Sequence, residues 1–265
     1  MLGAIAGDIA GSRFEGGPAP AVGFQLFHPD CRFTDDTVCT LAVAAAWLDG
    51  VDYDTSLRRF VRRHPDRGYG GLFRRWALAD DAPAYGSWGN GAPMRTAAIG
   101  WLAADAAEAE REAAAQAAVS HDHPDAMAAA AATAIAVHLA RRAVPAAHIA
   151  TRLEDAFGYH LTPDAALTGG FDISAEGTVQ PALAVALHAE DWETAVRSAI
   201  GRGGDTDTLA CIAGGVAEAI HGLPGEVAAT ARAQLTADLR AVLDRFHAAL
   251  AGGAANPPAP PPRGR

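Results

Sequence analysis

Residues 126–142, AMAAAAATAIAVHLARR, say more about the fold than any other stretch of the sequence. Alanine is the strongest helix former, and the larger apolar side chains here recur at helical spacing rather than at every second residue. Comparable Ala-rich runs occupy residues 42–46 and 213–221. Few runs alternate as half-buried strands do, so the sequence predicts an all-α protein.

The same spacing argument predicts a series of helices along the rest of the chain. Pro145, Pro163, Pro181 and Pro224 stand where such helices begin or end, because proline interrupts a helix interior. The expected helices cover residues 2–12, 36–50, 54–63, 93–104, 107–119, 124–142, 146–157, 180–188, 191–200, 207–221 and 236–250.

The sequence shows no fixed-period repeat and no stretch typical of a linker between domains. We therefore expect one domain over residues 1–251. Residues 252–265 read GGAANPPAPPPRGR, a composition that cannot form a helix or bury much surface. We expect a disordered Pro/Gly-rich tail there.

The composition indicates a folded globular chain, since half of the 265 residues are hydrophobic and 20% are charged. The 21 basic and 31 acidic residues give a net charge of −10, which argues against a basic groove for nucleic acid or an anionic membrane.

Cys31, Cys39 and Cys211 form no CxxC pair, which favours a reducing compartment. Residues 1–11 are apolar but too short to cross a bilayer and lack the basic start of a signal peptide, so we expect a cytoplasmic protein.

Two acidic clusters stand directly before apolar helical runs: TDDT at residues 34–37 and GGDTDT at residues 203–208. Either cluster alone fits a helix N-terminus, where Asp and Thr are common caps. Together they hold more carboxylates than capping needs. If the two helix ends meet, the four carboxylates repel one another unless cations neutralise them. All-oxygen ligands suit Mg²⁺, Mn²⁺ or Ca²⁺ better than Zn²⁺, and four acids suit two ions.

Three further motifs are less specific. YGSWGNGAPMR at residues 85–95 fits either an ordinary glycine-rich turn or a loop that binds phosphate. SHDHP at residues 120–124 fits a helix cap, a structural histidine or a substrate-contacting histidine, and it lacks the third ligand of a zinc site. Gly3, Gly7 and Gly11 predict close helix packing rather than a dinucleotide-binding loop.

These clusters, in this order, resemble the ADP-ribosylglycohydrolase family, which includes the dinitrogenase-reductase-activating glycohydrolases and crystallin-J1-like proteins. The matching segments are GAIAGDIAGSRFEG (3–16), FTDDTVCTLAVA (33–44), YGSWGNGAPMR (85–95), SHDHPDA (120–126) and GGDTDTLACIAGGVAEAIHG (203–222). The two acidic segments are the specific ones. The resemblance implies a compact single-domain orthogonal helical bundle with two divalent cations, Mg²⁺ or Mn²⁺, at one end.

The resemblance also implies roles for individual residues. The implied metal ligands are Thr34, Asp35, Asp36, Asp205, Asp207 and Thr208. The implied substrate contacts are Ser87, Trp88, Gly89, Asn90, Gly91 and His121. Asp207 is expected to bridge the two ions, and Glu15 or Asp36 to activate water or pass a proton to the leaving group. One departure is Leu167-Thr168-Gly169-Gly170: short bacterial relatives often carry an Arg and a Tyr shortly before a segment like FDISAEGTVQPA (171–182), and this stretch has neither.

The expected reaction is metal-dependent hydrolysis of the C1″ bond between ADP-ribose and an acceptor, through an oxocarbenium-like centre. The acceptor stays open between arginine, serine, a nucleic-acid base and a small conjugate such as O-acetyl-ADP-ribose. Two alternatives are a catalytically silent ADP-ribose-binding or crystallin-like structural protein and a two-metal phosphoesterase. The expected partner is ADP-ribose or an ADP-ribosylated substrate. Nucleic acid is expected only as a modified substrate, no membrane is expected, and the chain is expected to be a monomer.

Overall fold

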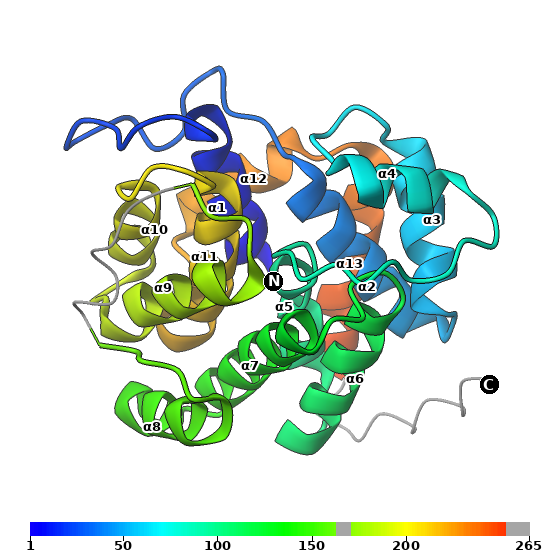
Figure 1. Ribbon diagram of the computed structural model, residues 1–265. Helices are drawn as coiled ribbons and strands as arrows, with labels where there is room; N and C mark the ends of the chain where they lie inside the picture. The colour runs from blue at the N-terminus through cyan, green and yellow to red at the C-terminus, as the bar shows by residue number, and fades with distance from the viewer. Residues whose placement is uncertain (163–170, 253–265) are drawn as a thin grey trace.

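The computed structural model of the chain describes residues 1–162 and 171–252. Within these ranges it has thirteen α-helices, two short 3₁₀ helices and no β-strand, apart from two isolated bridges. The all-α prediction is confirmed. Figure 1 shows the helices crossing one another at steep angles, with α7 running across the lower part of the bundle.

The α-helices are α1 (Leu2–Gly11), α2 (Asp35–Asp49), α3 (Tyr53–Arg63), α4 (Gly71–Leu78), α5 (Ala97–Leu102), α6 (Ala106–Ala118), α7 (Pro124–Arg141), α8 (Ala146–Phe157), α9 (Ala175–His188), α10 (Trp192–Ile200), α11 (Thr206–His221), α12 (Gly225–Gln234) and α13 (Ala237–Gly252). The 3₁₀ helices are η1 (Ser12–Phe14) and η2 (Pro93–Arg95).

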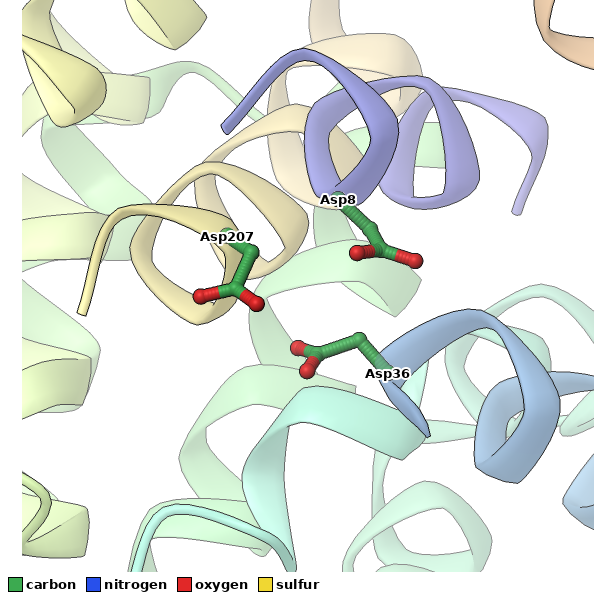
Figure 2. A group of neighbouring side chains, drawn as sticks. All are labelled: Asp8, Asp36 and Asp207. Carbon is green, nitrogen blue, oxygen red and sulfur yellow. The ribbon is translucent and has the colours of Figure 1, made fainter. Parts of the chain in front are cut away.

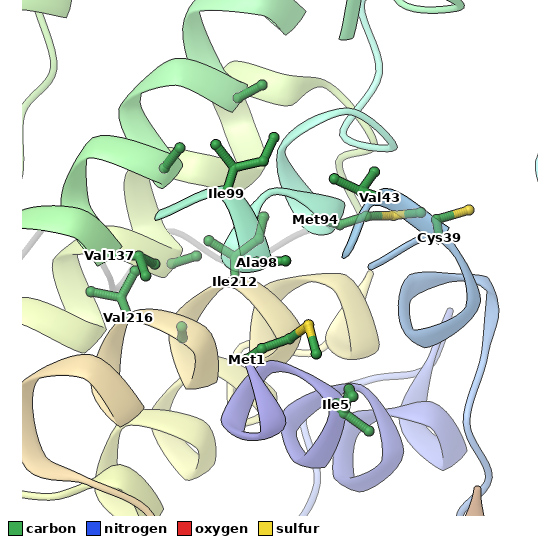
Figure 3. Packing of buried hydrophobic residues seen from close by; sticks show 14 of the residues in the cluster. Met1, Ile5, Cys39, Val43, Met94, Ala98, Ile99, Val137, Ile212 and Val216 are labelled. Atoms are coloured by element: carbon green, nitrogen blue, oxygen red, sulfur yellow. The ribbon is translucent and has the colours of Figure 1, made fainter. Parts of the chain in front are cut away.

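Helix α7, which contains the Ala-rich stretch, is a central packing element. It contacts α5, α6, α8, α9 and α11, and most of its alanines are fully buried. Small side chains let neighbouring helices approach closely, while the larger apolar residues fill the spaces between them. Figure 3 shows Val137 of α7 next to Val216 of α11, with Ile99 of α5 in the same core.

The most extensive helix pairing among the described residues is between α1 and α11. A Cβ atom added at Gly7 would lie 2.0 Å from the carbonyl oxygen of Ala210, and one at Gly11 would lie 2.4 Å from that of Thr206. The prediction of close helix packing through these glycines is therefore confirmed. Because Gly11 ends α1 and Thr206 begins α11, the same packing brings the end of one helix to the start of the other.

The prediction for residues 180–188 is wrong at its start. Helix α9 begins at Ala175 and contains Pro181 in its interior. The hydroxyl of Ser174 accepts a hydrogen bond from the backbone N–H of Gly177 at 3.0 Å, so a serine cap starts the helix well before the proline. Pro181 is itself buried, and burial of this face of α9 outweighs the hydrogen bond that proline cannot make.

Two further helices, one divided helix and the end of the last helix also differ from the predictions. Helices α4 and α12 were not predicted. The predicted helix 93–104 is divided into η2 and α5. Gly252, expected in the tail, is the last residue of α13.

The rest of the predicted tail lies outside the described residues, as do Pro163 and the Leu167–Gly170 departure. Of the helices that the structure describes, none has the length and apolarity that a bilayer crossing requires.

We expect Gly7→Ala to lower the free energy of unfolding by about 1–3 kcal/mol or more, because the added methyl group overlaps the backbone of α11. Urea unfolding followed by circular dichroism measures the change. Gly225→Ala is the matched control, since no atom lies within 4 Å of its added Cβ. A Gly7→Ala protein as stable as this control would contradict the close packing of α1 and α11.

Candidate metal centre and active site

The two acidic corners meet at one point of the bundle. The carboxylates of Asp36 on α2 and Asp207 on α11 offer oxygen atoms within 4.8 Å of each other and of Asp8 on α1. Figure 2 shows these three side chains pointing toward one another from three helices. The hydroxyl of Thr208 also lies 3.3 Å from Asp36 Oδ2, across 172 positions of sequence. The prediction that the corners converge is confirmed.

Thr34 both caps helix α2 and contacts the acidic cluster. Its Oγ1 accepts a hydrogen bond from the backbone N–H of Asp36 at 3.3 Å, which is the N-cap interaction of α2. The same hydroxyl donates to Asp8 Oδ1 at 2.7 Å. Helix capping therefore fixes the first turn of α2, where Asp35 and Asp36 lie.

Asp8 is a site residue that the sequence analysis did not identify. It is fully buried and accepts hydrogen bonds from the backbone N–H groups of Thr34 and Thr37, at 3.0 and 3.1 Å, and from both hydroxyls. Its signal in the sequence is a single acid within a helix whose other residues are apolar or glycine. Four donors converging on one carboxylate hold the first corner against α1.

Glu15 belongs to a second acidic group. Carboxylate oxygens of Glu15, Asp205 and Asp207 lie within 4.8 Å of one another. The backbone N–H of Gly16 donates to the carbonyl of Gly204 at 2.7 Å, which ties the Glu15 loop to the second corner. Gly203 has a φ of +71°, and a Cβ there would lie 2.6 Å from the backbone nitrogen of Ala19, so the Gly-Gly pair is needed for this contact.

Burial and mutual repulsion make this acidic cluster electrostatically costly. Burial, followed by neighbouring carboxylates, raises the pKa values of Asp35, Asp36 and Asp207 well above their ordinary range. The pKa of Glu15 is also raised, first by burial and then by Asp205. Among the described residues, the buried Oδ1 of Asp36 has no hydrogen-bond partner.

This arrangement fits divalent cations. A bound cation would neutralise the repelling carboxylates, and the unpaired oxygen of Asp36 could coordinate it. The predicted ligands Asp35, Asp36, Asp205, Asp207 and Thr208 all line one cavity. Thr34 does not line it, because its hydroxyl faces Asp8. The donor set consists of carboxylate and hydroxyl oxygens, the ligands that Mg²⁺ and Mn²⁺ prefer.

The cavity has a volume of about 350 Å³ and extends from the acidic cluster to the glycine-rich loop. Five of the predicted substrate contacts line it: Ser87, Gly89, Asn90, Gly91 and His121. Trp88 does not line it and is 51% exposed beside it. The geometry thus gives one cavity an acidic end and a loop end.

Asn90 connects those two ends. Its amide nitrogen donates to Asp205 Oδ2 at 2.6 Å and to Thr178 Oγ1 at 3.1 Å. Its backbone N–H donates to the carbonyl of Ile173 at 2.9 Å, so the start of α9 supports the loop. Asn90 therefore orients a predicted metal ligand as well as lining the cavity.

Comparisons with known proteins identify the family and the fold. The family model described as ADP-ribosylglycohydrolase matches residues 1–256. A solved structure described as "ADP-ribosylglycohydrolase-related protein complex" has 25% sequence identity and a TM-score of 0.71, over 93% of this chain and 96% of that chain. The search of curated proteins found no match.

The raised pKa values predict how metal-free stability depends on pH. Protonated Asp36 and Asp207 are favoured in the folded state more than in the unfolded state, so the folded state binds protons more tightly. In chelator, the free energy of unfolding should fall as the pH rises above about 4, the ordinary pKa of Asp, by up to about 1.4 kcal/mol per pH unit for each proton that only the folded state holds.

Denaturant titrations in chelator at several pH values measure this slope. Adding Mg²⁺ or Mn²⁺ should restore stability most at the alkaline end, where the carboxylates are ionised. The Asp36→Asn protein should show a shallower slope and gain less stability from the metal. Stability that rises with pH in chelator would contradict the electrostatic description of the cluster.

Proposed function

The chain belongs to the ADP-ribosylglycohydrolase family, and we propose that it hydrolyses the C1″ glycosidic bond that joins ADP-ribose to an acceptor. The observation that carries this proposal is the convergence of two acidic corners and a glycine-rich loop on one cavity. A hydroxyl-rich sugar fits the acidic end when cations occupy it, and a diphosphate fits the loop end.

In this proposal, two divalent cations, Mg²⁺ or Mn²⁺, would be held by the oxygens of Asp35, Asp36, Asp205, Asp207 and Thr208, which line the cavity. Thr34, the sixth predicted ligand, would join them only if its hydroxyl turned from Asp8 toward the ions. When bound, the ions supply positive charge that orients the hydroxyl groups of the ribose next to the scissile bond. Asp207 belongs to both acidic groups and would therefore contribute to holding either ion. Asp8 and Asn90 act behind these ligands, on Thr34 and Asp205 respectively.

The proposed proton carrier is Glu15. It is the exposed member of its acidic group and lines the cavity, so water can reach its carboxylate. As the oxygen of water bonds to C1″, Glu15 takes a proton from that water, while the acceptor leaves with the electron pair of its bond to C1″ and takes up a proton from solvent. A pKa raised by burial and by Asp205 brings this carboxyl closer to the neutral range in which a general base works well. Asp36 is nearly fully buried and is better suited to holding a cation.

The loop end of the cavity would hold the ADP part of the substrate. Ser87, Gly89, Gly91 and His121 line this end, and the backbone N–H groups of a glycine-rich loop can donate to phosphate oxygens. Trp88 lies beside the opening, where an exposed indole can stack on a flat ring.

We expect Asp36→Asn or Asp207→Asn to reduce release of ADP-ribose by at least about 100-fold and to weaken the binding of Mg²⁺ or Mn²⁺. Helical circular dichroism should stay near that of the original protein. Asp155→Asn is the matched control, because Asp155 lies on α8 away from the cavity. Turnover equal to the control in either variant would contradict the proposed centre.

The substrate panel should contain ADP-ribosylated arginine and serine peptides, an oligonucleotide with an ADP-ribosylated base, and O-acetyl-ADP-ribose. Mass spectrometry of the products should find intact ADP-ribose together with the free acceptor. AMP among the products would instead indicate a phosphoesterase. Tight binding of ADP-ribose without turnover of any substrate would indicate a catalytically silent binder.

A further inference from the structure

We propose that a buried relay, Arg95–Ser120–His121, fixes His121 as a neutral imidazole whose Nε2–H donates a hydrogen bond into the cavity. Arg95 and Ser120 are then positioning residues that act on a ligand through His121. The proposal depends on three features of the described residues: the confinement of Arg95, the direction of the hydrogen bonds through Ser120, and the position of His121 Nε2.

Arg95 is completely buried, and no ion pair joins it to a carboxylate among the residues that the structure describes. Its Nε donates to Gln116 Oε1 at 2.5 Å, and its Nη2 donates to the Gln116 carbonyl at 2.9 Å and to Ser120 Oγ at 3.1 Å. The side-chain amide of Gln116 is held in turn by the carbonyl of Ala92 at 3.0 Å. The guanidinium therefore has a fixed orientation, and one of its N–H groups points at Ser120.

The direction of the next hydrogen bond follows from the donors available. A guanidinium has donors only, so Ser120 Oγ must accept from Arg95, and its own proton is free to donate. Ser120 Oγ lies 2.8 Å from His121 Nδ1. If Nδ1 carried a proton, the hydroxyl proton of the fully buried Ser120 would have no hydrogen-bond acceptor among the described residues. Nδ1 is therefore the acceptor, and a neutral imidazole then carries its proton on Nε2.

The surroundings of His121 also favour the neutral form. Burial, followed by the positive charge of Arg95, lowers the pKa of His121 well below its ordinary range. The rings of Phe73 and Tyr85 lie with their centroids 6.0 and 5.8 Å from that of His121, and they restrict the tilt of the imidazole. Both rings line the same cavity.

His121 Nε2 lies at the glycine-rich loop. A Cβ added at Gly91 would come within 2.8 Å of this nitrogen, and one at Gly89 within 4.0 Å. His121 lines the same cavity as this loop. The ligand atom that meets Nε2 must accept a hydrogen bond, which selects an oxygen over an N–H or ammonium group. Where the proposed function holds, that oxygen belongs to ADP-ribose.

The tautomer can be measured without any substrate. Two-dimensional ¹⁵N NMR of the histidine rings at neutral pH should show His121 protonated on Nε2 and unprotonated on Nδ1. His121→Gln assigns the signal. A proton on Nδ1, or a charged imidazolium, in the original protein would overturn the proposal whether or not the chain is a glycohydrolase.

Ser120→Ala tests the relay itself. It should mix the two His121 tautomers, because Nδ1 loses its donor. Ser56→Ala is the matched control: Ser56 is equally buried, its hydroxyl donates to the carbonyl of Ala42 at 2.7 Å, and it lies outside the cavity. A Ser120→Ala spectrum equal to that of the control would overturn the relay, and if this variant does not fold, the spectrum of the original protein still decides the tautomer.

Binding of ADP-ribose, measured by calorimetry, tests the donor role. His121→Gln keeps a neutral N–H donor near the position of Nε2 and should bind within a few-fold of the original protein. His121→Leu should bind roughly 10- to 100-fold more weakly, the loss expected when a hydrogen bond to a charged oxygen is removed. Equal losses in both variants would overturn the donor role, whereas no binding by the original protein would count against the proposed function and leave the NMR result to decide the relay.

Discussion

Repulsion between buried carboxylates is the constraint on which the rest of the structure depends. Asp8, Asp36 and Asp207 converge within 4.8 Å in an apolar bundle, where like charges cost far more than they do in water. The fold offsets part of this cost itself. Helices α2 and α11 both begin at the cluster, and the positive ends of their dipoles favour nearby negative charge. Four hydrogen bonds donated to Asp8 also stabilise the negative charge of its carboxylate. The charge that is left requires a cation or a proton, and this requirement connects the helix packing to the chemistry.

The packing of α1 on α11 brings the carboxylates together, so a change in this helix contact also changes the distances between them. Gly7 and Gly11 let the two backbones touch, and Asp8 lies between them in sequence, so its carboxylate is carried to the corner where α11 begins. A larger residue at Gly11 would separate the second corner from Asp8. The same contact therefore stabilises the core and sets the spacing of the acids, which means that stability and metal affinity should change together along this interface.

Sequence reasoning predicts the features that local chemistry determines. The helical class follows from alanine and spacing, and the acidic corners are noticeable because capping does not need so many carboxylates. The residues that it does not assign depend on tertiary surroundings. Asp8 looks like an interruption of an apolar run until four donors from Thr34 and Thr37 are seen around it. Arg95 lies inside a noticeable motif, but its complete burial and its contact with Ser120 join segments that no local pattern connects. The predicted start of α9 is wrong because a proline usually stands at a helix end, whereas here the cap at Ser174 begins the helix and Pro181 lies inside it.

The cavity has opposite electrostatic character at its two ends, and this polarity gives a ligand a direction. At one end, acids lack compensating positive charge. At the other, the cation Arg95 is buried without an ion pair among the described residues, and His121 stays uncharged beside it. With cations bound at the acidic end, both ends attract oxygen, but in different ways: a cation binds hydroxyl oxygens directly, whereas the imidazole offers a single directed donor. Asn90 spans the two ends, contacting Asp205 while its loop lies beside His121. A substrate with a sugar diol at one end and phosphate oxygens further along matches this arrangement in one orientation only, so the direction of binding follows from charge before any contact with the acceptor is made.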